Sequence, residues 1–301
     1  MVESILDLIG KTPLVRLHKV NSSGSTIWAK MDALNPSGSI KDVMALYMMD
    51  VAEKRGELKP GAKIIEATSG NTGIAFAMLA RIRGHKFVAV MPEYMSQERR
   101  QMMEAFGAEI VLTPAAEGFA GTMKKFEELA EEDPDAWLPR QFDNPDNTAA
   151  HREITGKRIL EDISDRIAAF IAGVGTGGTL MGVAEALKKV YPNVKIVAVE
   201  PAESAVMSGD DSGYHNIQGI GPGFIPGLVN MDLVDDIIAV SSEDAMSMTR
   251  NLVREEGLMV GISSGANVLA ALRLAGEMGD GKTIVTVLPD RVERYVSMGV
   301  F

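Results

Sequence analysis

The sequence predicts an α/β protein of two lobes, each a mostly parallel sheet flanked by helices. Two observations indicate this fold class: short apolar runs rich in β-branched residues alternate with amphipathic stretches, and glycine-rich turns join several runs to the stretches that follow. The 301 residues suffice for two lobes, and 46% hydrophobic with 24% charged residues is an ordinary globular balance.

Eight apolar runs of strand length follow one another along the chain. They are TIWAKM (26–31), KIIEA (63–67), FVAVM (87–91), EIVLT (109–113), AAFIAGV (168–174), KIVAVE (195–200), DIIAV (236–240) and TIVTVL (283–288). Between them, apolar residues recur three or four positions apart, which is the helical period. The expected helices are one that starts at Lys41 and those over residues 73–84, 96–107, 244–257 and 265–277. Buried strands separated by helices are typical of a parallel sheet covered on both faces.

Two polar loop regions interrupt this alternation. Residues 138–151 (LPRQFDNPDNTAAH) are rich in turn residues, and we interpret them as a crossing between the lobes. Residues 208–232 form a loop longer than a connection requires, which is typical of functional loops. We therefore expect a large domain of residues 1–38 and 146–301, a smaller mobile domain of residues 39–145, and an active-site cleft between them.

Composition excludes several classes of function. The chain has 30 Lys plus Arg and 41 Asp plus Glu, and a net charge of −11 argues against a nucleic-acid partner because phosphate contacts need clustered basic residues. It has no cysteine, which excludes disulfides, cysteine-ligated zinc and a thiol nucleophile. The four histidines are scattered, so we expect no metal site. There is neither a signal-peptide pattern nor an apolar run of roughly 18 to 20 residues, so we expect a cytoplasmic protein that does not enter a membrane.

One lysine occupies an unusual position. The stretch NPSGSIKD (35–42) delivers Lys41 to the first turn of an expected helix. A cation is mildly unfavourable there, because the N-terminal end of a helix already carries positive potential. A lysine that only caps a turn is one interpretation, and a lysine with a chemical role is the other.

Three glycine-rich segments precede expected helices. TSGNTG (68–73) and GVGTGGT (173–179) each follow an expected strand, and GISSGAN (261–267) is a third instance. Hydroxyls and the free N–H groups of a helix N-terminus together form an anion-binding site. Open α/β sheets bind ligands at such turns, so the three segments predict a ligand-binding site.

A dinucleotide fingerprint is also present. Gly173, Gly175 and Gly178 spell G-x-G-x-x-G, and Glu200 follows at about the expected distance at the end of the next strand. An NAD-dependent dehydrogenase is therefore an alternative. It explains neither Lys41 behind its turn nor TSGNTG in the other lobe, whereas a phosphate-bearing cofactor that also needs a lysine explains all three features.

Together these motifs resemble the cysteine synthases (O-acetylserine sulfhydrylases), pyridoxal-phosphate enzymes of the tryptophan-synthase-β fold, which is fold type II. The resemblance runs nearly end to end through IGKTPLVRL, NPSGSIKD, EATSGNTGIAFAM, MPEYMSQERRQMMEAFGAEIVLT, QFDNPDN, GVGTGGTLMGV, IQGIGPGFIP, GISSGAN and PDRVERYVSMGVF. The first half and the tail are more similar to the B branch of the family, whereas GVGTGGT and IQGIGPGFIP are more similar to the A branch.

The resemblance implies a role for each matching residue. Lys41 matches the lysine that forms a Schiff base with pyridoxal phosphate and later moves the substrate α-proton, and positive surroundings with partial burial would lower its pKa for this purpose. Asn71 matches the residue that binds the cofactor ring oxygen, and Ser263 the hydroxyl that faces the pyridine nitrogen. The phosphate loop corresponds to Gly175, Thr176, Gly177, Gly178 and Thr179. The substrate-binding groups correspond to Thr68, Ser69, Thr72, Gln141 and Gly219.

The implied reaction is a β-replacement in which O-acetyl-L-serine and sulfide give L-cysteine and acetate. A serine at position 263, rather than a carboxylate, leaves the pyridine nitrogen largely neutral, which suits β-elimination better than transamination or racemisation. Several alternative reactions would need the same residues. They are cystathionine synthesis, lanthionine synthesis, sulfide release from cysteine, and cysteine synthesis from O-phosphoserine. A non-catalytic protein that has kept the fold is an alternative of another class, and the presence of Lys41 argues against it.

One segment that lacks basic residues helps to decide between two possible substrates, O-acetylserine and O-phosphoserine. The segment from Ile196 to Thr249 contains no lysine or arginine, and His215 is its only potential cation. Binding a phosphate in a cleft calls for a guanidinium or ammonium, so the sequence predicts a preference for O-acetylserine over O-phosphoserine. Arg99 or Arg100, from the SQERR helix, is the alternative source of a cation.

Two positions depart from the usual pattern of the family. Val43 stands where the family has arginine after Lys-Asp, and Val292 stands where it has glycine before Glu-Arg-Tyr. We expect these changes to affect efficiency and substrate range rather than the catalytic roles. The resemblance also implies a homodimer, and it raises docking of a serine acetyltransferase tail in the cleft.

Overall fold

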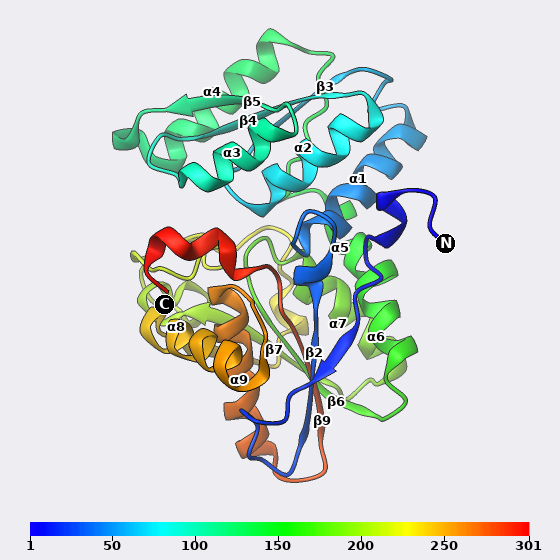
Figure 1. Cartoon of the computed structure of the whole chain (residues 1–301), viewed down its shortest axis with the longest axis vertical. Coiled ribbons are helices and arrows are strands. Elements are labelled where there is room, and N and C mark those ends of the chain that lie inside the picture. The colour runs from blue at the N-terminus through cyan, green and yellow to red at the C-terminus, as the bar shows by residue number, and fades with distance from the viewer. Residues whose placement is uncertain (301) are drawn as a thin grey trace.

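The computed structural model describes residues 1–300, and it contains two sheets with helices on both faces (Figure 1). The larger sheet has the strand order β1-β2-β9-β6-β7-β8 and the smaller sheet has the order β3-β4-β5. All neighbouring strands run parallel except β1 and β2. The strands are β1 Leu14–Arg16, β2 Thr26–Lys30, β3 Lys63–Ala67, β4 Lys86–Pro92, β5 Glu109–Thr113, β6 Ile167–Gly173, β7 Lys195–Pro201, β8 Asp236–Val240 and β9 Thr283–Val287.

The helices lie between the strands as the alternation predicts. The α-helices are α1 Lys41–Arg55, α2 Asn71–Arg83, α3 Gln97–Ala105, α4 Gly118–Glu132, α5 Pro145–Ala150, α6 Lys157–Asp162, α7 Gly178–Val190, α8 Ser242–Asn251 and α9 Ile262–Met278. Two π-helical segments extend α5 and α8, namely η4 His151–Gly156 and η8 Leu252–Glu256, and a 3-10 segment η9 covers Val292–Met298. None of the helices in residues 1–300 is long and apolar enough to cross a bilayer.

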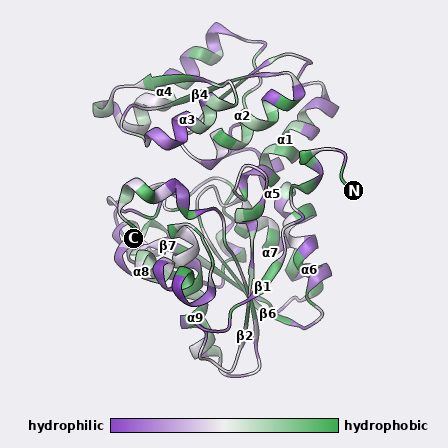
Figure 2. Ribbon diagram, viewed as in Figure 1, coloured by the Kyte–Doolittle hydropathy of each residue, from purple (hydrophilic) through white to green (hydrophobic). Residues whose placement is uncertain are grey.

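The larger sheet buries both of its faces. In β6, Ala169 and Ile171 pack toward α8 and α9, whereas Phe170 and Ala172 pack toward α6 and α7. Figure 2 shows the hydrophobic residues along the strands and on the sides of the helices that face them. Burying one such isoleucine or phenylalanine contributes about 1.5 to 3 kcal/mol to the hydrophobic stabilisation, so this core holds the loops at the strand ends in place.

The smaller sheet also buries both of its faces, although it has only three strands. In β3, Ile64 packs with α1 and α2, whereas Ile65 packs with Phe126 of α4 on the opposite face. The sheet and helices α1 to α4 fall within residues 39–145, and the division of the chain into two domains at these positions stays a prediction.

The eight expected strands are confirmed, and the expectation of a continuous loop over residues 138–151 is wrong. β1 is an additional antiparallel edge strand of three residues, too short for its period to show in the sequence. Residues 138–151 are not a continuous loop, because α5 begins at Pro145. The side chain of Asn144 accepts a hydrogen bond from the N–H of Asp146, and proline occupies the first turn, where its missing N–H costs nothing.

The third glycine-rich segment does not follow a strand. Gly261 caps the N-terminus of α9, but the element before it is η8, and Val260 forms only an isolated bridge with Arg291. The N–H of Gly261 donates to the carbonyl oxygen of Asp290 at 2.9 Å. The start of α9 is therefore held against the end of β9 rather than by a preceding strand of its own.

Candidate active site

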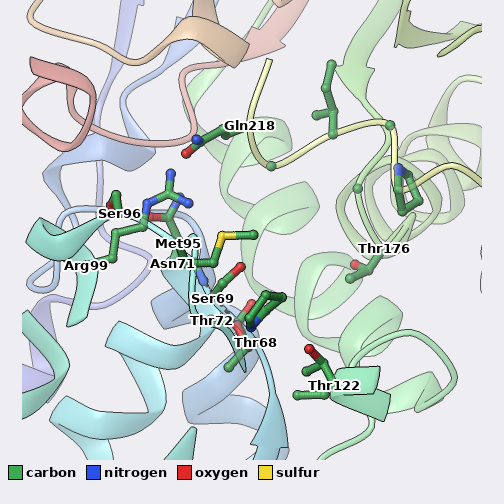
Figure 3. Close-up of a pocket in the computed structure, with 18 of the residues that line it drawn as sticks. Thr68, Ser69, Asn71, Thr72, Met95, Ser96, Arg99, Thr122, Thr176 and Gln218 are labelled. Atoms are coloured by element: carbon green, nitrogen blue, oxygen red, sulfur yellow. Dashed lines mark hydrogen bonds between the residues drawn. The ribbon is translucent and has the colours of Figure 1, made fainter. Parts of the chain in front are cut away.

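A cleft of about 860 Å³ is lined by residues from the loops of both sheets (Figure 3). Its size suits a cofactor together with a small substrate. The expected site residues on its wall are Lys41, Thr68, Ser69, Asn71, Thr72, Gln141, Gly175, Thr176 and Gly219. Four others do not line it and lie instead at the N-terminal ends of α7 and α9, namely Gly177, Gly178, Thr179 and Ser263.

The loop before Lys41 is held by two charged side chains. The carboxylate of Asp42 accepts from the N–H of Ser37 at 2.7 Å and also from the hydroxyl of Ser37. The guanidinium of Arg294 donates to the carbonyl oxygens of Ser37 and Gly38. Gly38 has a φ of 88°, and a Cβ there would meet the Arg294 guanidinium. As a result α1 begins at Lys41 in one defined position.

The environment of Lys41 favours a neutral amine. Burial lowers the pKa of Lys41 to about 8, and the nearby carboxylate of Asp290 opposes this by raising it. About a tenth of the amine is therefore unprotonated at pH 7, far more than for an ordinary lysine, and the unprotonated amine is the form that attacks a carbonyl group. The start of α1 is an unfavourable place for a charged lysine, and the lowered pKa of Lys41 suits a nucleophilic amine.

Asp290 is a buried carboxylate that the sequence analysis missed. Its Oδ2 accepts from the amide of Asn71 at 2.7 Å and from the hydroxyl of Tyr295 at 2.5 Å. Among the described residues, its Oδ1 and the Oδ1 of Asn71 have no hydrogen-bond partner. Unsatisfied buried oxygens indicate a place where a ligand supplies donors. The available signal was an acidic residue just beyond the carboxyl end of a buried strand, where α/β sheets place functional groups.

We expect Asp290→Asn to lower the pKa of Lys41 further, because the carboxylate charge that raises this pKa is removed. The rate at which formaldehyde and cyanoborohydride label Lys41, followed by peptide mass mapping against pH, should reach its midpoint at a lower pH in the variant. Asp280→Asn removes an exposed charge and serves as the control. An unchanged or higher midpoint in Asp290→Asn would show that the two groups do not interact.

The segment TSGNTG forms the turn between β3 and α2. The hydroxyl of Thr72 donates to Oε1 of Gln141 at 2.7 Å, so the two expected substrate-binding residues meet although they come from different segments. Asn71 is the first residue of α2, and Thr68 and Ser69 precede it on the cleft wall. The free N–H groups of the helix and these hydroxyls together make an anion-binding corner.

The segment GVGTGGT approaches a second loop closely. Gly175 lies against Gly219, and a Cβ at Gly175 would stand 2.3 Å from the carbonyl oxygen of Gly219. The N–H of Gly221 donates to the carbonyl oxygen of Val174 at 2.9 Å. Gly177 has a φ of 86°, which lets the chain turn into α7. The backbone N–H groups at the start of α7 can therefore hold a phosphate without a basic side chain.

Ser263 lies at the start of α9 and its side chain is buried. The same helix contacts the end of β6, because Oδ1 of Asn267 accepts from the N–H of Gly173 at 2.8 Å. The first turns of α9 therefore lie against the strand from which the segment GVGTGGT continues.

Arg99 of α3 is a cation on the cleft wall that the sequence left as an alternative. Its side chain is 5% exposed, and its guanidinium lies 5.4 Å from the centre of the Tyr295 ring. Figure 3 shows Arg99 beside Ser96 and Asn71. Arg100, by contrast, is held by the carbonyl oxygen of Glu93. The cleft therefore has a guanidinium from α3, outside the segment from Ile196 to Thr249.

The dinucleotide fingerprint has a structural explanation. Glu200 is 2% exposed, and its carboxylate accepts from the N–H groups of Met207 and Ser208 at 2.8 and 3.0 Å. It caps its own loop and is not available to bind a ribose, as the NAD-dependent alternative would require. Residues 1–300 contain no group of three or more His, Asp or Glu side chains that could hold a metal ion.

Comparisons with known proteins agree on one family. The family model for pyridoxal-phosphate dependent enzymes matches residues 5–290. A cysteine synthase of Staphylococcus aureus is 49% identical over 302 residues, which cover 100% of this chain and 97% of the relative. The crystal structure of a cysteine synthase from Entamoeba histolytica has a TM-score of 0.96 and 43% identity, covering 100% of this chain and 91% of that one. An O-acetylserine dependent cystathionine β-synthase from Helicobacter pylori has a TM-score of 0.94 and 39% identity, covering 100% and 99%.

Proposed function

The chain belongs to the family of pyridoxal-phosphate dependent enzymes, and on that premise we propose that it is a cysteine synthase that converts O-acetyl-L-serine and sulfide into L-cysteine and acetate. The observation that carries the proposal is Lys41, an amine whose pKa is lowered to about 8, on the wall of a cleft that also contains two anion-binding turns. A carbonyl-reactive lysine between two such turns suits a phosphorylated aldehyde and a substrate carboxylate.

The residues present fit pyridoxal phosphate. The close approach of Gly175 to Gly219 leaves a backbone cradle that a Cβ would fill, and this cradle suits the cofactor phosphate. The Nδ2 of Asn71 donates one hydrogen to Asp290 and has a second hydrogen that can be donated to the cofactor ring oxygen. Ser263 would face the ring nitrogen from the start of α9, and Lys41 would hold the aldehyde carbon. Gly177, Gly178 and Thr179 would complete the phosphate site.

Each protein group then has a task in the reaction. Bound pyridoxal phosphate supplies an electron sink for the bond that breaks at the substrate α-carbon. The corner formed by Thr68, Ser69, Thr72 and Gln141 binds the substrate carboxylate, and the backbone at Gly219 lies near the amino group. Lys41 removes the α-proton through its neutral amine and later returns a proton, so acetate leaves from the β-carbon and sulfide takes its place.

Steady-state kinetics test the function directly. O-acetylserine, O-phosphoserine, serine and cysteine should each be offered with sulfide or with homocysteine. We expect the highest kcat/KM for O-acetylserine with sulfide. A higher value with homocysteine, or sulfide release from cysteine as the main reaction, would replace cysteine synthesis with one of the other β-replacements or eliminations.

We expect the enzyme to consume O-acetylserine faster than O-phosphoserine at equal concentration. The acetyl ester is neutral, whereas a phosphate dianion needs a cation, and the guanidinium of Arg99 is already stacked on the Tyr295 ring. A competition assay that follows both leaving groups measures the preference. The expectation is wrong if the wild-type enzyme consumes both substrates at comparable rates. If Arg99→Met then loses activity on O-phosphoserine alone, Arg99 leaves the Tyr295 ring to bind the phosphate group.

We expect Ser263→Asp to slow β-replacement and to increase side reactions at the α-carbon. A carboxylate near the pyridine nitrogen favours its protonation and makes a stronger electron sink. Product analysis for transamination and racemisation, beside the rate of cysteine formation, measures the change. Ser263→Ala is the control without a charge. If both variants kept the wild-type rate and product ratio, Ser263 would not face the ring nitrogen.

We further propose that the protein is a cytoplasmic homodimer in which residues 39–145 move as a unit against the rest. Residue composition and the family resemblance support this assembly and location. Docking of a serine acetyltransferase tail is supported by the cleft wall, where the side chains of Tyr214 and Phe224 are 88% and 40% exposed. Sedimentation of the protein alone and with a synthetic acetyltransferase C-terminal peptide would measure both associations.

A further inference from the structure

We propose that Asn147 and His151 are positioning residues that orient the hydroxyls of Thr176 and Thr179 so that both donate to the cofactor phosphate. This inference rests on the proposed function, in which Gly175–Thr179 is the phosphate loop. Asn147 lies in α5 and His151 begins η4, so the two side chains are four positions apart on one helical face. Neither has a role in the site as described so far.

Both side chains are fully enclosed and contact the loop. Asn147 is 1% exposed and His151 is 0% exposed. Nδ2 of Asn147 lies 2.9 Å from Oγ1 of Thr176, and Nε2 of His151 lies 3.2 Å from Oγ1 of Thr179. The Nδ2 of Asn147 also donates to the carbonyl oxygen of Gln141 at 2.9 Å. Asn147 therefore joins the phosphate loop to the residue that closes the substrate corner.

Two glycines permit this approach. A Cβ at Gly178 would stand 2.1 Å from Oδ1 of Asn147. A Cβ at Gly182 would stand 2.3 Å from the carbonyl oxygen of Thr148, between α7 and α5. The helix that begins with the phosphate loop is thus pressed against α5 and η4 along its first turns. Such close packing is what fixes a hydroxyl to within the narrow range that a directed hydrogen bond needs.

The direction of the hydrogen bond at Thr176 follows from the donor inventory. An amide NH₂ only donates, so Oγ1 of Thr176 accepts from Asn147 and also from the N–H of Gly178 at 3.4 Å. A hydroxyl has two acceptor positions and one proton, so its proton remains for a third partner. In the proposed holoenzyme that partner is a phosphate oxygen.

At Thr179 the proposal requires the same direction, which is set by the tautomer of His151. Burial lowers the pKa of His151 to about 3, and the charges of Lys41 and Lys30 lower it further, so the ring is neutral. Its Nδ1 lies 2.9 Å from the hydroxyl of Thr155 in the same helical segment. If Thr155 donates to Nδ1, the ring proton is on Nε2 and donates to Thr179, which again leaves the threonine proton for phosphate.

The contacts from Asn147 and His151 explain how the loop Gly175–Thr179 can bind a phosphate dianion without a basic side chain. The hydroxyl of Thr176 accepts from two donors and the hydroxyl of Thr179 accepts from His151, so each keeps its proton for the phosphate. A hydrogen bond to a charged acceptor is stronger than one between neutral groups. Asn147 and His151 therefore determine affinity for the phosphate although neither touches it.

Binding of pyridoxal phosphate and of pyridoxal, which lacks the phosphate, to the apoenzyme tests the inference. We expect Asn147→Asp and His151→Leu to raise the Kd for pyridoxal phosphate by about 10- to 100-fold, because each removes a donor behind one charge-assisted hydrogen bond. The Kd for pyridoxal should stay nearly unchanged. His151→Gln keeps an N–H donor of similar reach and should restore most of the affinity. The ³¹P resonance of bound pyridoxal phosphate should shift in the two weakened variants.

The outcomes separate this inference from the proposed function. If wild type takes up pyridoxal phosphate on Lys41 and both variants bind it equally well, the inference is overturned and the proposed function stands. Equal weakening for pyridoxal phosphate and pyridoxal would assign Asn147 and His151 a purely structural role and would also overturn it. Circular dichroism of each apoprotein checks folding. Should His151→Leu fail to fold, Asn147→Asp, which changes a single heavy atom, decides the question. A wild type that takes up no pyridoxal phosphate would refute both proposals.

Discussion

Lys41→Ala should yield a folded protein that still binds pyridoxal phosphate but has lost turnover, with kcat reduced by about 10³-fold or more. The phosphate and ring contacts come from other segments, so cofactor binding should persist. Among the described residues Lys41 is the one lysine on the cleft wall, so its replacement removes the amine that takes the α-proton in the proposed reaction. Cofactor absorbance, and cysteine formation from O-acetylserine and sulfide, measure the two effects separately.

The control for this experiment lies on the same helix. Lys54→Ala removes an exposed amine near the end of α1 and should leave kcat at the wild-type value. Borohydride reduction of wild type followed by peptide mapping should place the pyridoxyl group on Lys41. A label on another lysine, or a colourless protein that takes up no cofactor, would refute the assignment.

Gly175→Ala should have the second-largest effect, weakening cofactor binding and lowering stability together. The added Cβ would stand 2.3 Å from the carbonyl oxygen of Gly219, a backbone atom that cannot rotate away. The two loops must then separate, which strains the hydrogen bond between Gly221 and Val174. Overpacking of this kind costs about 1 to 3 kcal/mol. Thermal unfolding of the apoprotein and titration with pyridoxal phosphate measure the two losses.

Gly276→Ala in α9 is the matched control. A Cβ there would meet nothing within 4 Å, so the substitution should be neutral or stabilise the helix by up to about 1 kcal/mol. If Gly175→Ala bound cofactor as tightly as Gly276→Ala, the close contact between the two loops would not form part of the phosphate site.

The strands and main helices could be predicted because their signals are local. In β3 and β6, neighbouring residues pack on opposite faces of a sheet that is covered on both sides, and this shows as an apolar run. Lys41, TSGNTG and GVGTGGT were found for a similar reason, since each motif is a continuous segment. Pro145 was missed because turn residues were interpreted as a loop, although Asn-Pro is also a helix start.

The partners of the site could not be predicted, because they are distant in sequence. Asn71 and Asp290 are 219 positions apart, and Asn147 and Thr176 are 29 apart. The residues around each of these side chains do not indicate which distant side chain it will contact in the folded protein. His151 is one of four histidines scattered along the sequence, and only the fold shows that its ring contacts the hydroxyl of Thr179. Composition pointed to neither Asn147 nor His151 as a residue that contacts the segment GVGTGGT.

Two long-range contacts affect the order in which the chain folds during translation. They are the pairing of β2 with β9 and the hydrogen bonds from Arg294 to the loop before Lys41. Thr26–Lys30 pairs with Thr283–Val287, and Arg294 is 256 positions from the carbonyl oxygen that it holds at Gly38. The smaller sheet, by contrast, pairs strands that are adjacent in the chain. During translation, β3 to β5 can assemble as soon as they leave the ribosome, whereas the loop before Lys41 is held in place only after β9 and Arg294 have been synthesised. A nascent chain released early would therefore carry a folded lobe and no reactive amine.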